Sequence, residues 1–240
     1  MSLLKPKLAH GDVVEIEGVP VRLKVHARAR RVSLRVDARG EVVAIAPNPR
    51  RLHDALAFAR ERVDWITSRA AAAPCGVAFA PGSTVPVRGE TARLTAIAGA
   101  SAARLLRDEA GLNIVSGGEG AAFARRVDRL LKTEARRDLE HRTELHVRAL
   151  GLDLPKVALG DPKSRWGSCT PARGSIRYSW RLILAPAFVL DYVAAHEVAH
   201  LVHADHSPRF WGVVRDLLGD EKAGRNWLKA HGRTLHAYGR

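Results

Sequence analysis

Two histidines and a glutamate that together could hold and use a metal ion stand in the segment His196-Glu197-Val198-Ala199-His200. If this segment is helical, residues four apart lie on one face about 6 Å apart along the axis, so both imidazoles can bind one ion. Glu197 is rotated about 100° from His196 and flanks the ion without binding it. A carboxylate there can take a proton from water on the metal, and neutral imidazoles suit zinc. The segment therefore predicts one zinc ion on His196 and His200, with Glu197 as the acid/base group.

A catalytic zinc ion needs a third protein ligand and an open position for water. His203 and His206 both follow the pair closely. On a straight helix His203 lies about 10 Å from His196, too far for both to bond one ion at about 2.0 Å. His206 lies beyond the expected end of the helix and can fold back. We therefore favour His206 as the third ligand, with Asp191 or Asp205 as acceptors for a ligand N–H.

The pattern His-Glu-x-x-His also arises by chance on helices, and this chain has 11 histidines. Two features favour a metal site: a third histidine follows at a usable distance, and Pro186 gives the helix an independent start signal. Apolar residues around the motif would also bury the site: Val193, Ala195, Val198, Ala199 and Leu201.

The elements that would position this segment form a helix-rich C-terminal half. Pro186 suits the first position of a helix that we expect to continue to about His203. Ser207-Pro208 is a typical N-cap and first-turn pair for the next helix, which Gly219 would end. A strand over residues 175 to 184 is expected to lie beside the metal helix.

A long helix and a glycine pair mark the beginning of that half. Residues 121 to 150 are rich in arginine and carry apolar residues at helical spacing, and Gly151 suits the C-cap. A last helix is expected over residues 221 to 230. Gly117-Gly118 separates the long helix from the strands before it. We therefore predict two modules, residues 1–118 and 119–240.

The N-terminal module is predicted to be rich in strands. Alternating apolar residues between positions 13 and 47 indicate a small antiparallel sheet, with a turn at Asp37-Ala38-Arg39-Gly40. The spacing changes to that of a helix over residues 50 to 72, and short strands return over residues 81 to 115. The predicted fold class is α+β, with this strand-rich module followed by a gluzincin-like helical zinc module with a small sheet.

Composition indicates an ordinary globular protein. Of 240 residues, 46% are hydrophobic and 27% are charged, and no apolar run is long enough for a signal peptide or a membrane span. A cytoplasmic location is therefore expected, with Cys75 and Cys169 as free thiols. The net charge of +14 would suit contact with nucleic acid, but the arginines are scattered, as biased codon usage also produces.

Four segments together closely resemble the YgjP-like metallopeptidase family. They are Arg165-Trp166-Gly167-Ser168-Cys169, Tyr178-Ser179-Trp180-Arg181-Leu182, residues 191 to 201 and His206-Ser207-Pro208-Arg209-Phe210-Trp211. The resemblance implies that His196, His200 and His206 bind zinc and that Glu197 is the catalytic acid/base. Residues 196 to 210 are also similar to the WLM and SprT proteases, which act on proteins crosslinked to DNA, so the basic charge acquires a use.

The ligand spacing also matches the metzincin proteases, but two departures argue against that class. The position of their glycine is His203 here, and the only methionine is Met1, so their methionine turn cannot form. A gluzincin-like arrangement is therefore expected.

The predicted function is a zinc-dependent hydrolase, with peptide hydrolysis by Glu197-assisted attack of zinc-bound water as the leading reaction. Arg165 could stabilise an oxyanion or hold a substrate carboxylate or phosphate, and Tyr178 could donate a hydrogen bond. An edge strand over residues 176 to 182 could hold the backbone of a protein or peptide substrate. The alternative is a metal-dependent phosphohydrolase acting on nucleotides. A non-catalytic, DNA-associated zinc domain ranks third, because Glu197 beside an open metal position suits catalysis.

Overall fold

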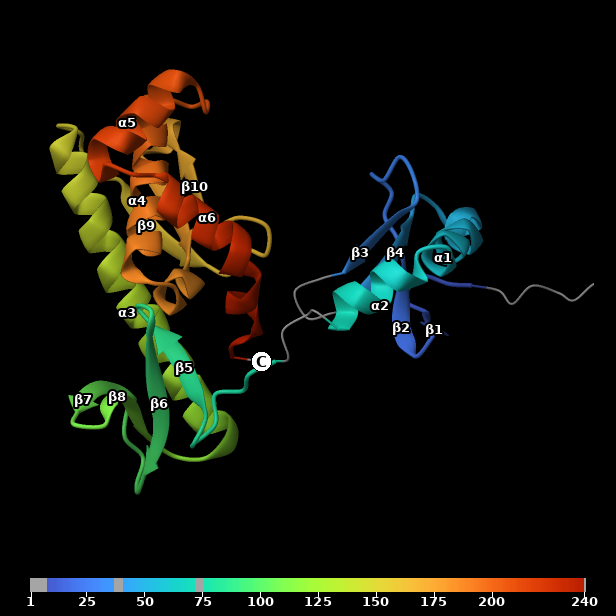
Figure 1. Ribbon diagram of the computed structural model, residues 1–240, viewed down its shortest axis with the longest axis horizontal. Coiled ribbons are helices and arrows are strands. Elements are labelled where there is room, and N and C mark those ends of the chain that lie inside the picture. Colours follow the sequence, from blue (N-terminus) through green and yellow to red (C-terminus); the bar gives the residue numbers. More distant parts are fainter. Residues whose placement is uncertain (1–7, 37–40, 72–75, 240) are drawn as a thin grey trace, which may run out of the picture. The chain divides into compact units, whose positions relative to one another are not determined.

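The computed structural model describes residues 8–36, 41–71 and 76–239 (Figure 1). The chain divides into two compact units, Met1–Cys75 and Gly76–Arg240. Each unit combines small sheets with helices, which confirms the predicted α+β class. The predicted turn at residues 37 to 40 and the predicted free thiol of Cys75 lie outside the described residues. Among the helices of these described ranges, none has the length and hydrophobicity that a membrane span requires.

The first unit contains a four-stranded sheet. Its strands are β1 (Val13–Ile16), β2 (Val19–Val25), β3 (Ser33–Val36) and β4 (Val42–Ala46), in the order β1-β2-β4-β3. The predicted strands form, but the prediction of an antiparallel sheet is wrong for the central pair, because β2 and β4 are parallel. After β2 the chain forms β3 at the edge of the sheet. It then turns back as β4, which lies between β2 and β3 and is antiparallel to β3. Alternation of apolar residues places strands but does not choose their neighbours.

Helices cover one face of this sheet. They are η1 (Pro49–Arg51), α1 (Leu52–Arg60) and α2 (Val63–Ala71). Leu52 and Leu56 of α1 and Ile66 of α2 pack against Leu23 and Ala44 of the strands, and all five are buried. The single helix predicted over residues 50 to 72 is interrupted between Arg60 and Val63, although no glycine or proline lies there.

The second unit begins with a sheet that repeats the topology of the first. Its strands are β5 (Thr84–Val87), β6 (Glu90–Ile97), β7 (Arg104–Asp108) and β8 (Gly111–Gly117), in the order β5-β6-β8-β7 with a parallel central pair. The first hairpin turns match as well. Glu17 and Arg88 both have positive φ angles, 48° and 54°, and each precedes a glycine with positive φ, Gly18 and Gly89. Non-glycine residues rarely adopt this conformation, so the same turn is built twice.

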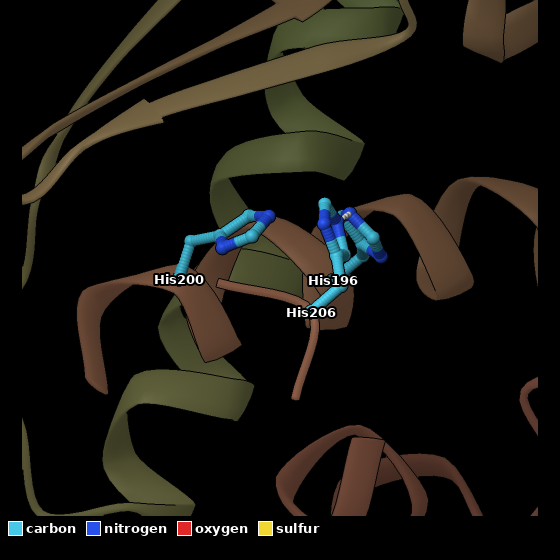
Figure 2. A group of neighbouring side chains, drawn as sticks. All are labelled: His196, His200 and His206. Carbon is cyan, nitrogen blue, oxygen red and sulfur yellow. Dashed lines mark hydrogen bonds between the residues drawn. The ribbon is translucent and has the colours of Figure 1, made fainter. Parts of the chain in front are cut away.

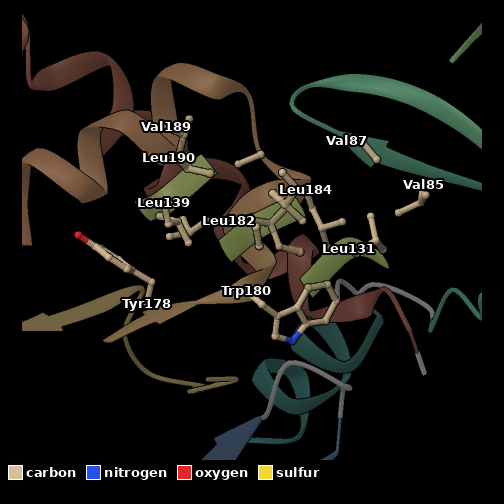
Figure 3. Close-up of a cluster of buried hydrophobic side chains, with 14 of the residues drawn as sticks. Val85, Val87, Leu131, Leu139, Tyr178, Trp180, Leu182, Leu184, Val189 and Leu190 are labelled. Carbon is tan, nitrogen blue, oxygen red and sulfur yellow. The ribbon is translucent and has the colours of Figure 1, made fainter. Parts of the chain in front are cut away.

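The division between the units differs from the predicted boundary at residue 118. Val85, Leu94 and Ile114 of this second sheet share one buried core with Phe123 and Val127 of the helix that follows. Figure 3 shows this core, with Val85 and Val87 facing the layer that contains Leu131 and Leu182. Gly117-Gly118 therefore marks the end of β8 inside the second unit, because the sheet buries its apolar face in a core that it shares with that helix.

The rest of the second unit forms the layers around the motif. It consists of α3 (Gly120–Ala149), β9 (Lys156–Gly160), β10 (Gly167–Thr170), η2 (Pro171–Arg173), β11 (Ser175–Ser179), η3 (Trp180–Leu184), α4 (Ala187–Val202), α5 (Pro208–Leu218), α6 (Lys222–His231) and η4 (Gly232–Ala237). The predicted helices form with small shifts of their ends. Gly151 has the left-handed φ of 65° that suits its predicted position after α3.

The strand beside α4 is not the predicted one. The predicted strand over residues 175 to 184 stops at Ser179 and continues as η3. The three-stranded sheet has the order β10-β11-β9, so β11 is central and β10 is an edge. Helix α4 packs against β10, and also against α3, α5 and α6. The edge strand nearest the motif is therefore residues 167 to 170, and not the predicted residues 176 to 182.

Candidate metal centre

Three histidines converge at the end of α4. His196 and His200 lie one turn apart on that helix, and His206 lies in the segment that leads into α5 (Figure 2). Each offers one ring nitrogen, and these atoms lie within 4.8 Å of one another. Helix α4 ends at Val202, and the backbone at His203 is extended. The chain therefore folds back as predicted, and His206 joins the pair while His203 does not.

The distance between two of the ligand nitrogens fits a zinc ion. Tetrahedral zinc with Zn–N bonds of 2.0–2.1 Å separates two nitrogens by about 3.3 Å. The Nε2 atoms of His196 and His206 face each other at 3.2 Å. Burial, with a further effect of His200 and His206, lowers the pKa of His196 to about 3, so its imidazole is neutral. Metal ligation requires the neutral form, so the donor set is suited to zinc.

The orientation of His200 is fixed by a backbone group. Its Nδ1 lies 3.0 Å from the carbonyl oxygen of His203, which can only accept, so Nδ1 donates and Nε2 is left for an ion. The predicted acceptors lie elsewhere. Asp191 pairs with His146 of α3 at 2.8 Å, and Asp205 accepts from the Ser207 N–H at 3.2 Å. That prediction is therefore wrong for both carboxylates.

The ring of Phe210 packs against all three histidines of the cluster. The ring of Phe210 is fully buried, and its centroid lies 4.9, 4.5 and 4.8 Å from those of His196, His200 and His206. Ser207 caps α5 by accepting from the Phe210 N–H, as its sequence position predicts. Phe210 thus anchors the segment that returns His206 to the pair.

Glu197 is buried against the edge strand β10. Its residue exposure is 5%, and burial raises its pKa to about 7, against the opposing effects of the Arg165 charge and the Cys169 N–H. Gly167 of β10 makes this position accessible, because a Cβ there would lie 2.6 Å from both Cγ and Cδ of Glu197. A carboxylate with a pKa near neutrality can both accept and release a proton.

Replacing Gly167 by alanine should therefore displace the Glu197 carboxylate and leave the three histidines, and any metal that they bind, in place. A shift of about 1 Å in a catalytic group costs on the order of 10²-fold in rate, so we expect a loss of that size. The matched control is Gly212→Ala in α5, where an added Cβ meets no atom within 4 Å. Turnover and zinc content measured on both variants test this, and equal activity of the two would show that Glu197 does not need the space at Gly167.

The two predicted substrate contacts have different outcomes. Arg165 is exposed and its charge acts on Glu197, and among the described residues no carboxylate pairs with it. It therefore lies at the site with a free guanidinium. Tyr178 is 0% exposed, and its hydroxyl bonds Thr143 of α3 at 2.9 Å (Figure 3). Tyr178 is a core residue, so the prediction of a substrate contact there is wrong.

Sequence reasoning missed the groups that hold Glu197. Gly167 and the Cys169 N–H come from a segment that resemblance singled out without assigning a task to either residue. A glycine inside a short strand often marks a close approach of another group, and that signal was present at Gly167. The Cys169 thiol itself is free and half-buried, and burial raises its pKa to about 11.

Comparison with known proteins agrees with this geometry. The sequence model of the family described as YgjP-like, metallopeptidase domain, matches residues 30–231. No curated protein matches the chain. The family match includes the three histidines, Glu197 and the whole of β10, and it extends over most of the sequence. The chain therefore belongs to the YgjP-like metallopeptidase family.

Proposed function

We propose that this protein is a zinc-dependent peptidase that uses Glu197 as its acid/base group. The observation that carries the proposal is the convergence of His196, His200 and His206 at the end of the helix that also presents a buried Glu197. The family match supports hydrolysis of peptide bonds. One zinc ion on the three histidines would leave a position open for water.

Glu197 would transfer the proton during the reaction. When bound, zinc supplies a Lewis acid that polarises water and the substrate carbonyl. Glu197 accepts a proton from the attacking water at its carboxylate and then donates it to the leaving amine. A pKa of about 7 suits both steps, and the Cys169 N–H keeps one carboxylate oxygen in place during them.

The substrate backbone would lie along β10. The Cys169 N–H reaches Glu197, so the outer edge of this strand faces the site. An extended peptide can add to such an edge through main-chain hydrogen bonds. Arg165, just before β10, would then hold a substrate carboxylate or the developing oxyanion with its free guanidinium.

Removal and return of zinc tests this proposal. Cleavage of an unfolded protein by the purified chain should stop after dialysis against a strong chelator, because the histidines alone do not polarise the carbonyl. One equivalent of zinc per chain should restore it. Cleavage that continues in chelator, with zinc shown to be absent, would exclude a zinc peptidase.

A further inference from the structure

A groove in the first unit lies between the edge strand β3 and helices α1 and α2, which both contact that strand; Figure 1 labels the three elements. Its volume is about 520 Å³, within the range of ligand sites. It is lined by Arg31 and Leu34 on one side and by Phe58, Arg62 and Trp65 of the helical segment on the other. Among the described residues no carboxylate lines it, although Glu61 and Asp64 neighbour two of these residues in sequence.

Two aromatic rings are available in this groove. Trp65 is 40% exposed and Phe58 is half-buried. The guanidinium of Arg62 lies 5.5 Å from the centroid of the Phe58 ring. Among the described residues, Trp65 is not one of those that pack against the first unit's core, so its ring is available on this wall for stacking with a ligand.

Further exposed arginines lie close in sequence to Arg31, which lines the groove. Arg28, Arg30 and Arg31 precede β3 and Arg35 lies on it, and all four are exposed. Within the described part of the chain, no carboxylate forms an ion pair with any of them. Other arginines of the unit do have partners, since Arg22 pairs with Glu41 and Arg51 with Asp54. Four exposed arginines thus lie within residues 28 to 35 without an ion-pair partner among the described residues, whereas the whole sequence indicates a scattered distribution.

We propose that this groove binds single-stranded nucleic acid. Bases would stack on Trp65 and Phe58, while Arg28, Arg30 and Arg31 neutralise the phosphates along the strand. Aromatic platforms beside a basic track are the chemistry that single strands require, because their bases are free to stack. A duplex would offer phosphates to the arginines but no free base to the rings.

An acidic peptide added to the edge of β3 would be the competing occupant. Edge pairing uses backbone groups and does not need two aromatic rings on the helices opposite. The combination of rings and arginines therefore favours nucleic acid. The experiment below compares both ligands, so it can also identify a peptide.

Stacking is tested by fluorescence anisotropy of a labelled oligothymidylate of about 12 nucleotides with the full-length chain. Trp65→Ala should weaken binding about 5- to 150-fold, the range for loss of one stacked base. Trp65→Phe should recover most of the affinity, which separates stacking from a folding defect. The matched control is Phe188→Ala, which removes a 49% exposed aromatic ring from the second unit and should leave binding unchanged.

The arginines are tested by the salt dependence of the same binding. In one variant glutamine replaces Arg28, Arg30 and Arg31 together. The magnitude of the slope of log K against log salt should fall by about 2, since each phosphate contact contributes about 0.7. The control removes three exposed arginines of the second unit that have no ion-pair partner among the described residues: Arg93, Arg104 and Arg173. It should leave the slope close to that of the wild type.

Equal losses in the two arginine triples, or no loss in Trp65→Ala, would overturn the proposal and leave only non-specific attraction to a basic protein. Tighter binding of an acidic peptide than of the oligonucleotide would also overturn it. Glu197→Gln should bind the oligonucleotide like the wild type, so this result does not depend on whether the metal centre is a peptidase.

Discussion

Replacing His206 by alanine should weaken zinc binding by more than about 100-fold, the upper range for loss of a group that merely supports a ligand. His206 supplies one of three converging nitrogens, and its Nε2 faces that of His196 at 3.2 Å. The side chain is exposed, so alanine should leave the buried Phe210 anchor and the fold intact. Competition with a chromophoric zinc chelator measures the affinity directly.

The matched control for that experiment is His203→Ala. The side chain of His203 is absent from the cluster, and only its backbone carbonyl is used, to accept from His200. Alanine retains the carbonyl, so zinc affinity should stay near the wild-type value. If His203→Ala lost the metal and His206→Ala kept it, the ligand set would have to be reassigned.

Glu197→Gln should reduce turnover about 10²- to 10⁴-fold while zinc content stays unchanged, as expected for loss of a general acid/base group. Glutamine has nearly the same shape, so it fits beneath Gly167, and its amide oxygen can still accept from the Cys169 N–H. It cannot take a proton from water at the pH of the assay. The defect should therefore be confined to the chemical step.

Two measurements on the same sample of Glu197→Gln distinguish its possible roles: the turnover rate at saturating substrate, and the zinc content. A loss of zinc in parallel with activity would indicate that the carboxylate supports the metal and not the proton transfer. Undiminished turnover with full zinc content would rule out the acid/base role.

The metal cluster could be predicted from sequence because helical geometry constrains it strongly. A spacing of four residues places His196 and His200 on one face of α4, and the N-cap and proline at Ser207-Pro208 imply that the chain leaves that helix before His206. Both inferences depend on local chain geometry, which sequence determines well. The three side chains accordingly meet as expected.

The surroundings of Glu197 could not be predicted, because they depend on contacts distant in the sequence. In its sheet β10 pairs only with β11, through Gly167 and Tyr178 among others, so it is an edge strand, and helix α4 packs against it. No local pattern distinguishes β10 from β11 as the edge. Tyr178 was misplaced for the same reason, because its partner Thr143 comes from the distant helix α3.

The repeated sheet topology did leave a signal in the sequence. Gly11 and Gly18 in the first unit recur as Gly82 and Gly89 in the second, and the backbone N–H of Gly11 and Gly82 bond Leu23 and Leu94 at 2.8 and 2.7 Å. Comparing the chain with itself would have identified the two sheets as related. It would also have placed the boundary between the units before the second sheet.

Product analysis after incubation with unfolded proteins and, separately, with nucleoside triphosphates tests the central claim most directly. Zinc-loaded wild type should produce new peptide termini, detected by mass spectrometry, that are missing with Glu197→Gln at equal zinc content. It should release no phosphate from the nucleotides. Release of phosphate that depends on Glu197, without any new peptide terminus, would contradict the peptidase assignment and identify a phosphohydrolase.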